Sequence, residues 1–358
     1  MSTSLTAIFH EPAQPLELRR VDVPTPVAGE VLVRVLGCTL CGSDLHTVSG
    51  RRTSPAPSVL GHEIVGEVVE LGPAAPTHDL AGVPLAVGDR VTWAIVASCG
   101  DCFYCQRALP QKCLRGVKYG HEQFVARREL TGGLAEYCLL APGTAIVKLP
   151  EGLPLEVACP ANCATATVAA ALAAAGPIAD RTVGILGAGM LGLTACAMAH
   201  LRGAAAVIAV EPNAARREQA LRFGATHAIA PEGLPATAAH VSAGQGLDVI
   251  LELSGASTAF DTAWPALCIG GTLVLVGAVF PGPPVAVSME QIVRRNLTIR
   301  GVHNYAPKDL LAAVEFLTAA QGRFPLQELV GPWYPLKEVA TALDSARDPR
   351  HLRVGIRG

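Results

Sequence analysis

The sequence predicts an α/β protein in which a mostly β region precedes a parallel sheet with helices on both faces. Three observations predict it. From about residue 164 to 300, short apolar runs alternate with Ala-rich, helix-like segments, which is the pattern of a doubly wound parallel sheet. A glycine motif directly follows one of these runs. From Leu16 to about Val147, short β-rich runs are broken by Gly and Pro, as in an irregular β domain.

Composition narrows the class of protein. A chain of 358 residues is long enough for about two domains. Its 28 Lys and Arg against 30 Asp and Glu give a net charge of -2, so neither nucleic acid nor an anionic membrane is an expected partner. The N-terminus lacks the pattern of a secretory signal. The 11 cysteines are therefore interpreted as metal ligands and reduced thiols, in a cytoplasmic protein.

Individual elements follow from the periodicity. The runs that predict parallel strands are Thr182 to Leu186, Ala206 to Val210, Val249 to Leu253 and Thr272 to Val276, and β-rich runs in the first region include Val31 to Val35 and Ile64 to Leu71. The uncharged stretch between Arg181 and Arg202 is assigned to a buried strand, a Gly turn and a helix rather than to a membrane span. An amphipathic helix is expected from Lys308 to Ala319, and the tail that follows is expected to pack on the first domain.

A dinucleotide site is indicated where the first parallel strand meets its helix. Gly187 permits a tight turn, Gly189 lets the backbone approach a pyrophosphate, and Gly192 lets the helix pack on its strand. Met190 and Leu191 belong to the same predicted site. Glu211 ends the next strand, where a carboxylate accepts hydrogen bonds from ribose hydroxyls and repels a 2′-phosphate, so NAD is favoured. Arg216 and Arg217 follow closely and offer an alternative that would receive that phosphate.

Cysteine spacing predicts one closed zinc site. Cys99, Cys102, Cys105 and Cys113 supply four thiolates within fifteen residues, which completes a tetrahedral shell and leaves no position for substrate. A second, dispersed set consists of Cys41, His62 and Cys163, with Glu63 next to the histidine. Spacing alone does not assemble it, because a lone Cys or His is more often an ordinary buried residue. If assembled, three ligands would leave a fourth position open.

These motifs, in this order, resemble the zinc-containing medium-chain alcohol dehydrogenase family over nearly the whole chain. The likeness rests on the segment from Cys41 to His46, on Gly61-His62-Glu63 with Gly66 and Gly72 behind it, and on the four-cysteine lobe and glycine motif. It implies a GroES-like catalytic domain at residues 1–163 and 304–358, and a Rossmann NAD-binding domain at 164–303. It also implies two zinc ions per chain and a homo-oligomer, either a dimer or a tetramer.

The resemblance also implies roles for single residues. Cys41, His62 and Cys163 match the catalytic zinc ligands, and Glu63 matches an acid that can act as an alternate ligand. Ser43 matches a hydroxyl that bonds the substrate oxygen, His46 the group that passes the proton to solvent, and Thr167 a residue near the nicotinamide. The cofactor site is completed by Val276, Gly277 and Ala278, which match the backbone holding the carboxamide, and by Arg353.

One departure from the family pattern concerns the substrate. Arg52 stands where an apolar residue facing the substrate is common, and Lys118 and His121 follow the zinc lobe. With Ile95 they form a candidate substrate pocket, and the alternative is that these charges face solvent. This segment also looks similar to dehydrogenases associated with phosphonate catabolism and to cyclitol dehydrogenases.

The predicted function is zinc-dependent hydride transfer between a small polar alcohol, polyhydroxylated or anionic, and NAD. Two alternatives remain at this stage. One is an enzyme that works mainly as an NADH-dependent aldehyde or ketone reductase, because the same site runs in both directions. The other is a non-catalytic NAD-binding relative, which would keep the closed zinc site alone.

Overall fold

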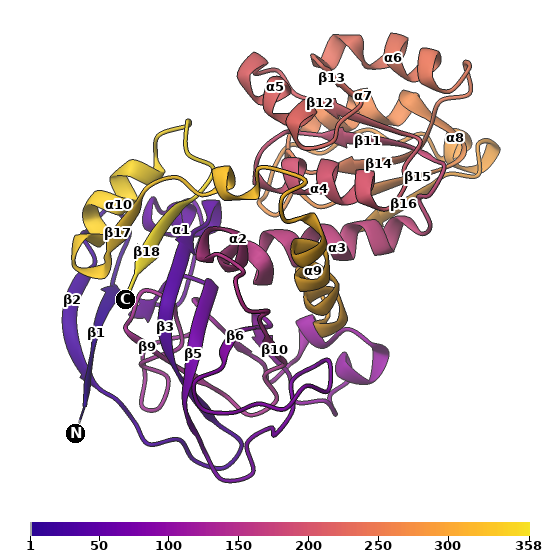
Figure 1. Cartoon of the computed structure of the whole chain (residues 1–358). Helices are drawn as coiled ribbons and strands as arrows, with labels where there is room; N and C mark the ends of the chain where they lie inside the picture. Colours follow the sequence, from indigo (N-terminus) through magenta and orange to yellow (C-terminus); the bar gives the residue numbers. More distant parts are fainter. Residues whose placement is uncertain (1) are drawn as a thin grey trace. The chain divides into compact units, whose positions relative to one another are not determined.

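The computed structural model describes residues 2–358, which form two compact units (Figure 1). Unit 1 consists of the described residues up to Ala166, together with Ala306–Ala319 and Leu326–Gly358. Unit 2 consists of Thr167–Tyr305 and Ala320–Pro325. Each unit has its own sheet and its own apolar core.

Unit 1 is built around strand β3 (Val31–Leu40), which pairs antiparallel with β5 (Glu63–Leu71), β9 (Tyr137–Leu140) and β18 (Val354–Arg357). In the described part of the unit, the large sheet is completed by β6 (Arg90–Trp93), β10 (Ile146–Lys148) and β17 (Trp333–Pro335). Smaller sheets join β2 (Glu17–Asp22), β1 (Thr3–Phe9) and β4 (Ser58–Val59), and separately β7 (Val96–Ala97) and β8 (Val117–Lys118). Apolar side chains on β3 and β5 are buried, so both strands lie in the core.

The C-terminal tail belongs to this unit, as the sequence predicts. Ile356 pairs with Cys38 and Gly355 with Thr39, so β18 lies beside the end of β3 that leads into Cys41. The helices of unit 1 are short, apart from α9: α1 (Gly42–Val48), η1 (Cys105–Arg107), η2 (Pro110–Lys112), α2 (Leu155–Ala158), η3 (Cys159–Asn162), α9 (Pro307–Ala320), η5 (Leu326–Leu329), η6 (Leu336–Glu338) and α10 (Val339–Ala346). Helix α3 (Ala164–Ala175) begins in unit 1 and continues in unit 2.

Unit 2 contains the predicted parallel sheet, in the order β13-β12-β11-β14-β15-β16 among the described residues. Its strands are β11 (Thr182–Leu186), β12 (Ala206–Val210), β13 (His227–Ile229), β14 (Leu247–Glu252), β15 (Leu267–Leu275) and β16 (Thr298–Gly301). Helices α4 (Met190–Leu201) and α5 (Ala214–Arg222) pack together, as do α6 (Leu234–Val241) and α7 (Ser257–Ala266). The strand order reverses at β11, so right-handed crossovers predict that the two pairs lie on opposite faces of the sheet.

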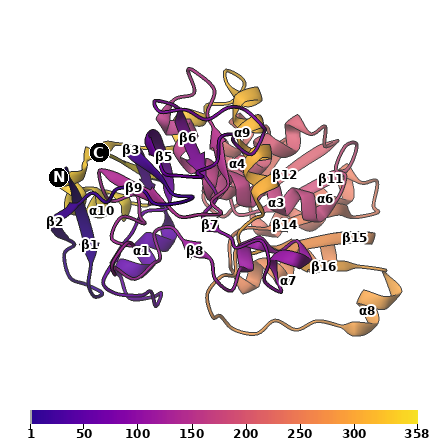
Figure 2. The same cartoon turned by 90° about the horizontal axis from the view of Figure 1, so that it is seen from below.

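The edge of this sheet at β16 is bordered by an excursion of the chain. Figure 2 shows the long connection from β15 that carries helix α8 (Met289–Arg294) before the chain returns to β16.

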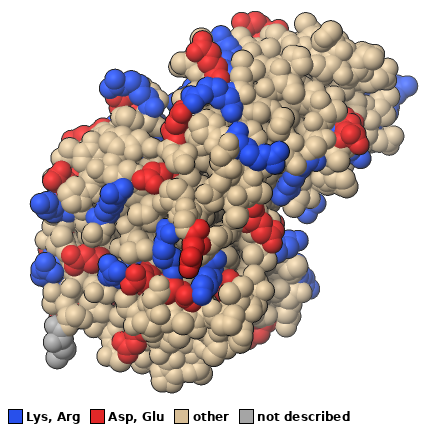
Figure 3. Space-filling view, in the orientation of Figure 1, with Lys and Arg blue, Asp and Glu red and all other residues tan. Residues whose placement is uncertain are grey.

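Two further observations concern the surface charge and the length of the helices. Charges of both signs are interspersed on the face seen in Figure 3. In residues 2–358 no single helix has the length and apolar character to cross a membrane, and only the bent pair Leu155–Asn162 and Ala164–Ala175 meets both criteria jointly.

Candidate functional site: two groups of metal ligands and a dinucleotide pocket

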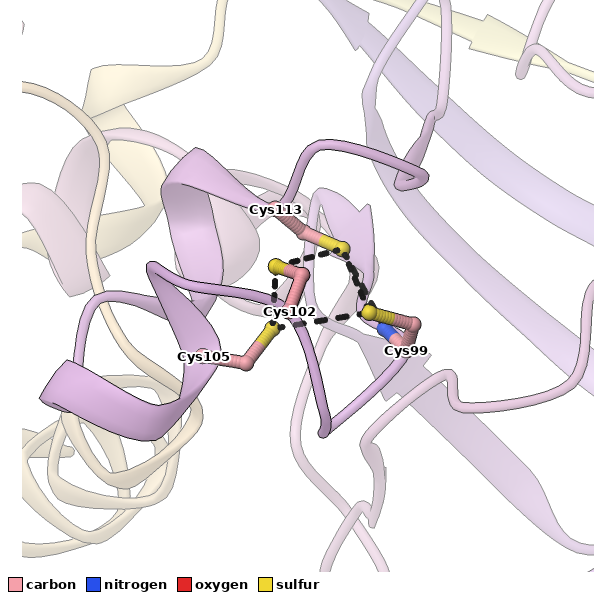
Figure 4. A group of neighbouring side chains, drawn as sticks. All are labelled: Cys99, Cys102, Cys105 and Cys113. Carbon is pink, nitrogen blue, oxygen red and sulfur yellow. Dashed lines mark hydrogen bonds between the residues drawn. The ribbon is translucent and has the colours of Figure 1, made fainter.

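The four cysteines predicted to bind one metal converge in a single lobe of unit 1. Figure 4 shows their sulfur atoms facing a common centre. The Sγ atoms lie 3.4 Å apart for Cys113 and Cys99, 3.5 Å for Cys102 and Cys105, 3.9 Å for Cys102 and Cys113, and 4.0 Å for Cys99 and Cys105. A tetrahedral zinc with Zn–S bonds of about 2.3 Å places its sulfurs about 3.8 Å apart. The lobe therefore fits zinc without rearrangement.

Backbone geometry in the lobe favours thiolates, the form that binds metal. The N–H of Cys99 donates to the sulfur of Cys113 at 3.3 Å. Backbone N–H groups of Leu114 and Cys105 lower the pKa of Cys102 to about 6. These donors stabilise negative sulfur in the way that a zinc ion requires.

The dispersed ligands also converge. A sulfur of Cys41, a nitrogen of His62, an oxygen of Glu63 and a sulfur of Cys163 all lie within 4.8 Å of one another. They come from three segments: Cys41 precedes α1, His62 precedes β5 and Glu63 begins it, and Cys163 follows η3. The donor set of two sulfurs, an imidazole and a carboxylate is one that zinc prefers.

Asn162 fixes the third of these segments, and sequence reasoning did not find it. Its side chain is fully buried, accepts a hydrogen bond from the N–H of Ile64 at 3.2 Å, and donates one to the carbonyl of Trp93 at 3.0 Å. These bonds tie η3 to β5 and β6. They hold Cys163 near His62, although about a hundred residues separate them.

Asp44 is the second residue that sequence reasoning missed. Its carboxylate accepts the N–H of Cys41 at 2.9 Å and the N–H of Gly61 at 3.2 Å, and it lies 3.4 Å from Nδ1 of His62. Burial opposes a charge on His62, but Asp44 and Cys41 outweigh it and raise the pKa of His62 to about 10. A carboxylate behind a ligating histidine orients the ring and fixes which nitrogen faces the metal.

The carboxylate of Glu63 is hydrogen-bonded to two side chains, Arg353 and Thr39. It accepts hydrogen bonds from Nε and Nη2 of Arg353 at 2.8 and 2.9 Å, and from the hydroxyl of Thr39 at 2.6 Å. Arg353 also lies 3.4 Å from the sulfur of Cys41. The guanidinium predicted to bind cofactor is thus buried in this ion pair, and its cofactor role, like the alternate-ligand role of Glu63, stays a prediction.

Helix α1 carries the two predicted proton-transfer groups. The hydroxyl of Ser43 lies 3.4 Å from Nε2 of His62. His46 is one turn further along, on the same side of the helix. Partial burial and the nearby charges of Arg51 and Arg52 lower the pKa of His46, so the ring is neutral and able to accept a proton near pH 7.

The candidate substrate residues also gather around this metal group. The positive charge of Arg52 interacts with the sulfurs of Cys41 and Cys163, and that of Lys118 with Cys163. The ring of His121 lies 5.1 Å from that of His62, between centroids, and its Nδ1 bonds the carbonyl of Tyr119 at 2.8 Å. Burial, followed by the charges of His62 and Arg52, lowers the pKa of His121.

Ile95 lies on the same side of unit 1. Its side chain is buried, and its carbonyl accepts the N–H of Tyr119 at 3.0 Å, next to the Lys118 position. Ile95 is buried, and Arg52, Lys118 and His121 are half-buried. These residues therefore do not all face bulk water, which was the alternative.

The glycine motif of unit 2 has the geometry its three positions predict. Gly187 has φ +95°, a left-handed conformation that favours glycine. A side chain at Gly192 would meet the carbonyl oxygen of Gly187 at 1.8 Å, so only glycine lets α4 begin so close to β11. Around Gly189 the space is open, and Met190 and Leu191 begin α4 beside it. The N-terminus of α4 can therefore receive an anion.

Glu211 lines a cavity of about 320 Å³ beside this motif, together with Gly187, Pro212, Ser254 and Thr258. Its carboxylate accepts the N–H of Ala188 at 2.8 Å and that of Asn213 at 3.0 Å. A carboxylate has about four acceptor positions, so some remain for a ligand hydroxyl.

Of the two arginines that follow Glu211, Arg217 has its guanidinium bonded to backbone carbonyls. Nη1 of Arg217 donates to the carbonyls of Glu211 and Pro212, at 2.8 Å each. Arg216 lies in the first turn of α5, where its N–H bonds the Asn213 side chain at 3.1 Å.

The remaining predicted cofactor residues lie directly after β15 and within α3. Val276 and Gly277 both donate backbone N–H groups to the carbonyl of Glu252 at 3.0 Å, and Ala278 is exposed beyond them. A side chain at Gly277 would meet the nitrogen of Gly255 at 2.3 Å, so the two loops pack backbone to backbone. Thr167 lies one turn into α3. The roles of these residues toward nicotinamide stay predictions.

Comparison with known proteins places this geometry in a family. A model of zinc-binding dehydrogenases matches residues 191–319, and a model of the alcohol dehydrogenase GroES-like domain matches residues 27–151. An L-threonine 3-dehydrogenase from Pyrococcus horikoshii is 35% identical over 312 residues, which cover 84% of each chain. The chain belongs to the zinc-containing medium-chain alcohol dehydrogenase family.

Solved structures agree with this membership. An alcohol dehydrogenase from Thermotoga maritima superposes with a TM-score of 0.93 at 28% identity, over 100% of both chains. A Sinorhizobium meliloti protein described as a zinc-binding dehydrogenase, with NADP bound, gives 0.86 at 26% identity, also over 100% of both. The predicted fold, a GroES-like domain and a Rossmann domain, is confirmed, as is the enzyme class. This member of the family is an alcohol dehydrogenase that uses zinc and a nicotinamide cofactor.

Proposed function

We propose that the chain oxidises a small polar alcohol, polyhydroxylated or anionic, with NAD as the hydride acceptor, at the group formed by Cys41, His62 and Cys163. The observation that carries this proposal is the convergence of those three ligands, within 4.8 Å of one another, beside the hydroxyl of Ser43. Three ligands from the protein leave one coordination position open for a substrate oxygen.

The reaction would convert an alcohol and NAD into a ketone or aldehyde, NADH and a proton. Zinc, when bound, supplies a Lewis acid that lowers the pKa of the substrate hydroxyl. Ser43 would accept the hydroxyl proton, and His46 would pass it to solvent from the same side of α1. Asp44 holds His62 in place, while the Arg353 ion pair neutralises Glu63.

Glu211 supports NAD as the cofactor. It is buried at the edge of the nucleotide cavity, and a 2′-phosphate there would meet a carboxylate at short range. Arg217, which would otherwise attract that phosphate, donates to backbone carbonyls.

Pairing with a second copy at β16 would account for the expected homo-oligomer. This strand is the last of its sheet among the described residues. An edge strand has unpaired backbone N–H and C=O groups, which can pair with a strand of another chain. On neighbouring α8, Met289 and Val293 are 81% and 73% exposed. A mass by light scattering of at least twice 37.0 kDa would support the proposal, and a monomer would refute it.

The function is tested by following NADH formation with purified, zinc-loaded protein. Polyols, cyclitols, anionic alcohols and aliphatic alcohols are compared, each with NAD and with NADP. The proposal expects a zinc-dependent reaction that prefers NAD and a polar alcohol. A preference for aliphatic alcohols would overturn the substrate assignment, and no turnover of any alcohol by zinc-loaded protein would overturn the reaction.

A further inference from the structure

Two cations come together at the metal group from separate parts of unit 1. Arg52 follows α1, where its backbone N–H donates to the carbonyl of His46 at 3.1 Å. Lys118 ends β8, which is held against β7 by the pairing of Lys118 with Val96. The two charges act on each other and on Cys163, and both side chains are partly buried. Backbone hydrogen bonds therefore fix the main chain at both positions.

Neither cation forms a salt bridge with a carboxylate of the described residues. Within residues 2–358, no hydrogen bond or salt bridge joins the Arg52 guanidinium or the Lys118 ammonium to a carboxylate. The acids nearby are committed elsewhere. Glu122 accepts the backbone N–H of Lys118 at 2.7 Å and pairs with Arg128, while Asp44 serves Cys41, Gly61 and His62.

Arg353 provides an internal comparison. It is buried near the same metal group, and Glu63 neutralises it through two hydrogen bonds. The chain thus supplies a carboxylate to this buried guanidinium. Placing two cations side by side without one costs free energy, through desolvation and mutual repulsion, unless a ligand brings the negative charge.

We infer that Arg52 and Lys118 form a clamp for an oxyanion group of the substrate, which makes the substrate an alcohol with a phosphate, phosphonate, sulfonate or carboxylate a short chain away from the carbinol carbon. This inference rests on the proposed function and narrows its substrate class, because it sets neutral polyols aside. Arg52 offers a planar fork for two oxygens, and Lys118 offers a point charge for a third.

The charges around the site support an anion. Two thiolates balance a zinc ion, and Arg353 balances Glu63. The charge of Asp44 acts on Arg52, whereas no carboxylate is among the charges that act on Lys118, so one positive charge remains before the substrate enters. A neutral polyol would leave that charge in place, whereas an oxyanion would compensate it. In the reaction the oxyanion is unchanged: the carbinol loses a hydride to NAD and a proton to solvent.

The first test compares kcat/KM for short-chain alcohols of similar length and for one cyclic polyol. The short-chain alcohols are 2-hydroxyethylphosphonate, 2-hydroxyethylsulfonate, 3-hydroxypropionate, 1-propanol and glycerol, and the cyclic polyol is myo-inositol. At least one anionic alcohol should exceed every neutral one by about tenfold or more, the scale of one charge-assisted hydrogen bond. The phosphonate and sulfonate share a tetrahedral shape but differ in charge, and the carboxylate shares the sulfonate's charge but is planar. Their order therefore separates charge from shape.

The second test removes the clamp. In Arg52→Leu and in Lys118→Met, the ratio of kcat/KM for the anionic alcohol to that for glycerol should fall by about tenfold or more. Arg20→Leu, on an exposed part of β2, and Lys337→Met, on η6, are matched controls in which the ratio should stay unchanged. An equal loss for both substrates in the clamp variants would overturn the inference.

The third test separates the clamp from catalysis. Calorimetry measures binding of methylphosphonate, methanesulfonate and acetate, which carry the oxyanion but no hydroxyl. Binding that persists in Cys163→Ala and is lost in Arg52→Leu supports the clamp, even if no alcohol is oxidised. Efficient oxidation of neutral polyols, without oxyanion binding, would leave the proposed function standing and refute the clamp.

Discussion

Single residues that orient the metal ligands matter as much as the ligands themselves. Asp44 is the main case, because one buried carboxylate connects Cys41, Gly61 and His62. Asp44→Asn keeps the size of the side chain but loses the charge behind the imidazole, so zinc affinity of this group should fall by about tenfold to a hundredfold. Competition with a chelator measures it.

A matched variant isolates that effect. Asp79 is another buried carboxylate that accepts backbone N–H groups, from Ala81, Val83 and Lys148, and it belongs to neither metal group. Asp79→Asn should lower stability and leave zinc affinity unchanged. Similar zinc affinities for both variants would show that Asp44 only supports the loop.

We also propose that the preference for NAD over NADP depends on one side chain, Glu211. Glu211→Ser removes the carboxylate from the nucleotide cavity, so the preference for NAD over NADP should narrow by about tenfold or more in kcat/KM. The KM for NAD should rise as well, because the N–H of Ala188 loses its partner. Glu218→Ser, on the exposed side of α5, is the control. Equal efficiency with both cofactors in the unaltered enzyme would contradict the assignment.

Lys118 predicts a pH dependence. Burial, with a smaller contribution from Arg52, lowers the pKa of Lys118 to about 8, while Cys163 acts in the opposite direction and Lys112 adds to the lowering. Because a lysine is charged below its pKa, the clamp should be complete below about pH 8 and weaken above it. The kcat/KM ratio of 2-hydroxyethylsulfonate, whose charge stays constant, to glycerol should therefore fall as pH rises through 8. In Lys118→Arg the fall should disappear; if it persists, another group titrates.

At the residue scale, the convergence of side chains could be predicted from sequence where a motif has a fixed spacing, and could not where it does not. Cys99 to Cys113 carry their geometry in their spacing. Asp44 was missed because a carboxylate in the first turn of a helix is an ordinary helix-capping feature, and its contact with His62 is not visible in the sequence. The same holds for Asn162, whose partners Ile64 and Trp93 are distant in the chain.

At the scale of elements, the four-cysteine lobe has little support from packing. It contains only η1 and η2 as regular structure, and Phe103, Leu109 and Leu114 are exposed in it. Metal binding must therefore supply much of its stability. Cys102→Ala should lower Tm by at least about 5 °C, since each kcal/mol shifts Tm by roughly 2–4 °C in proteins of this size. Cys268→Ala, on β15 and outside both metal groups, should have little effect.

Elements in the two units were predictable to different degrees. The strands Thr182–Leu186 and Ala206–Val210 match their predicted bounds, because buried parallel strands are short apolar runs. Helix α4 starts at Met190, between the second and the third glycine of the motif, because the glycine turn and the helix share residues. In unit 1 the pairing of β3 with β18 joins residues more than three hundred positions apart, which periodicity does not encode.

At the scale of the whole molecule, the fold is the one shared by the family. The candidate substrate site departs from the family pattern at Arg52. The ligand group, the glycine motif and the carboxylate at Glu211 support the proposed chemistry, and Arg52 and Lys118, which form no salt bridge, support the proposed anionic substrate. The chain order of these features could be read from the sequence. Their convergence required the structure, because Cys41, His62 and Cys163 meet only through the pairing of β3 with β5 and the docking of η3.

The most direct measurement is zinc content together with NADH formation, for the unaltered protein and for Cys163→Ala. The account predicts about two zinc ions per chain and turnover in the former, and about one zinc ion, no turnover and nearly unchanged Tm in the latter. Cys163→Ala with full zinc content and normal NADH formation would contradict the central claim that Cys41, His62 and Cys163 hold the catalytic metal.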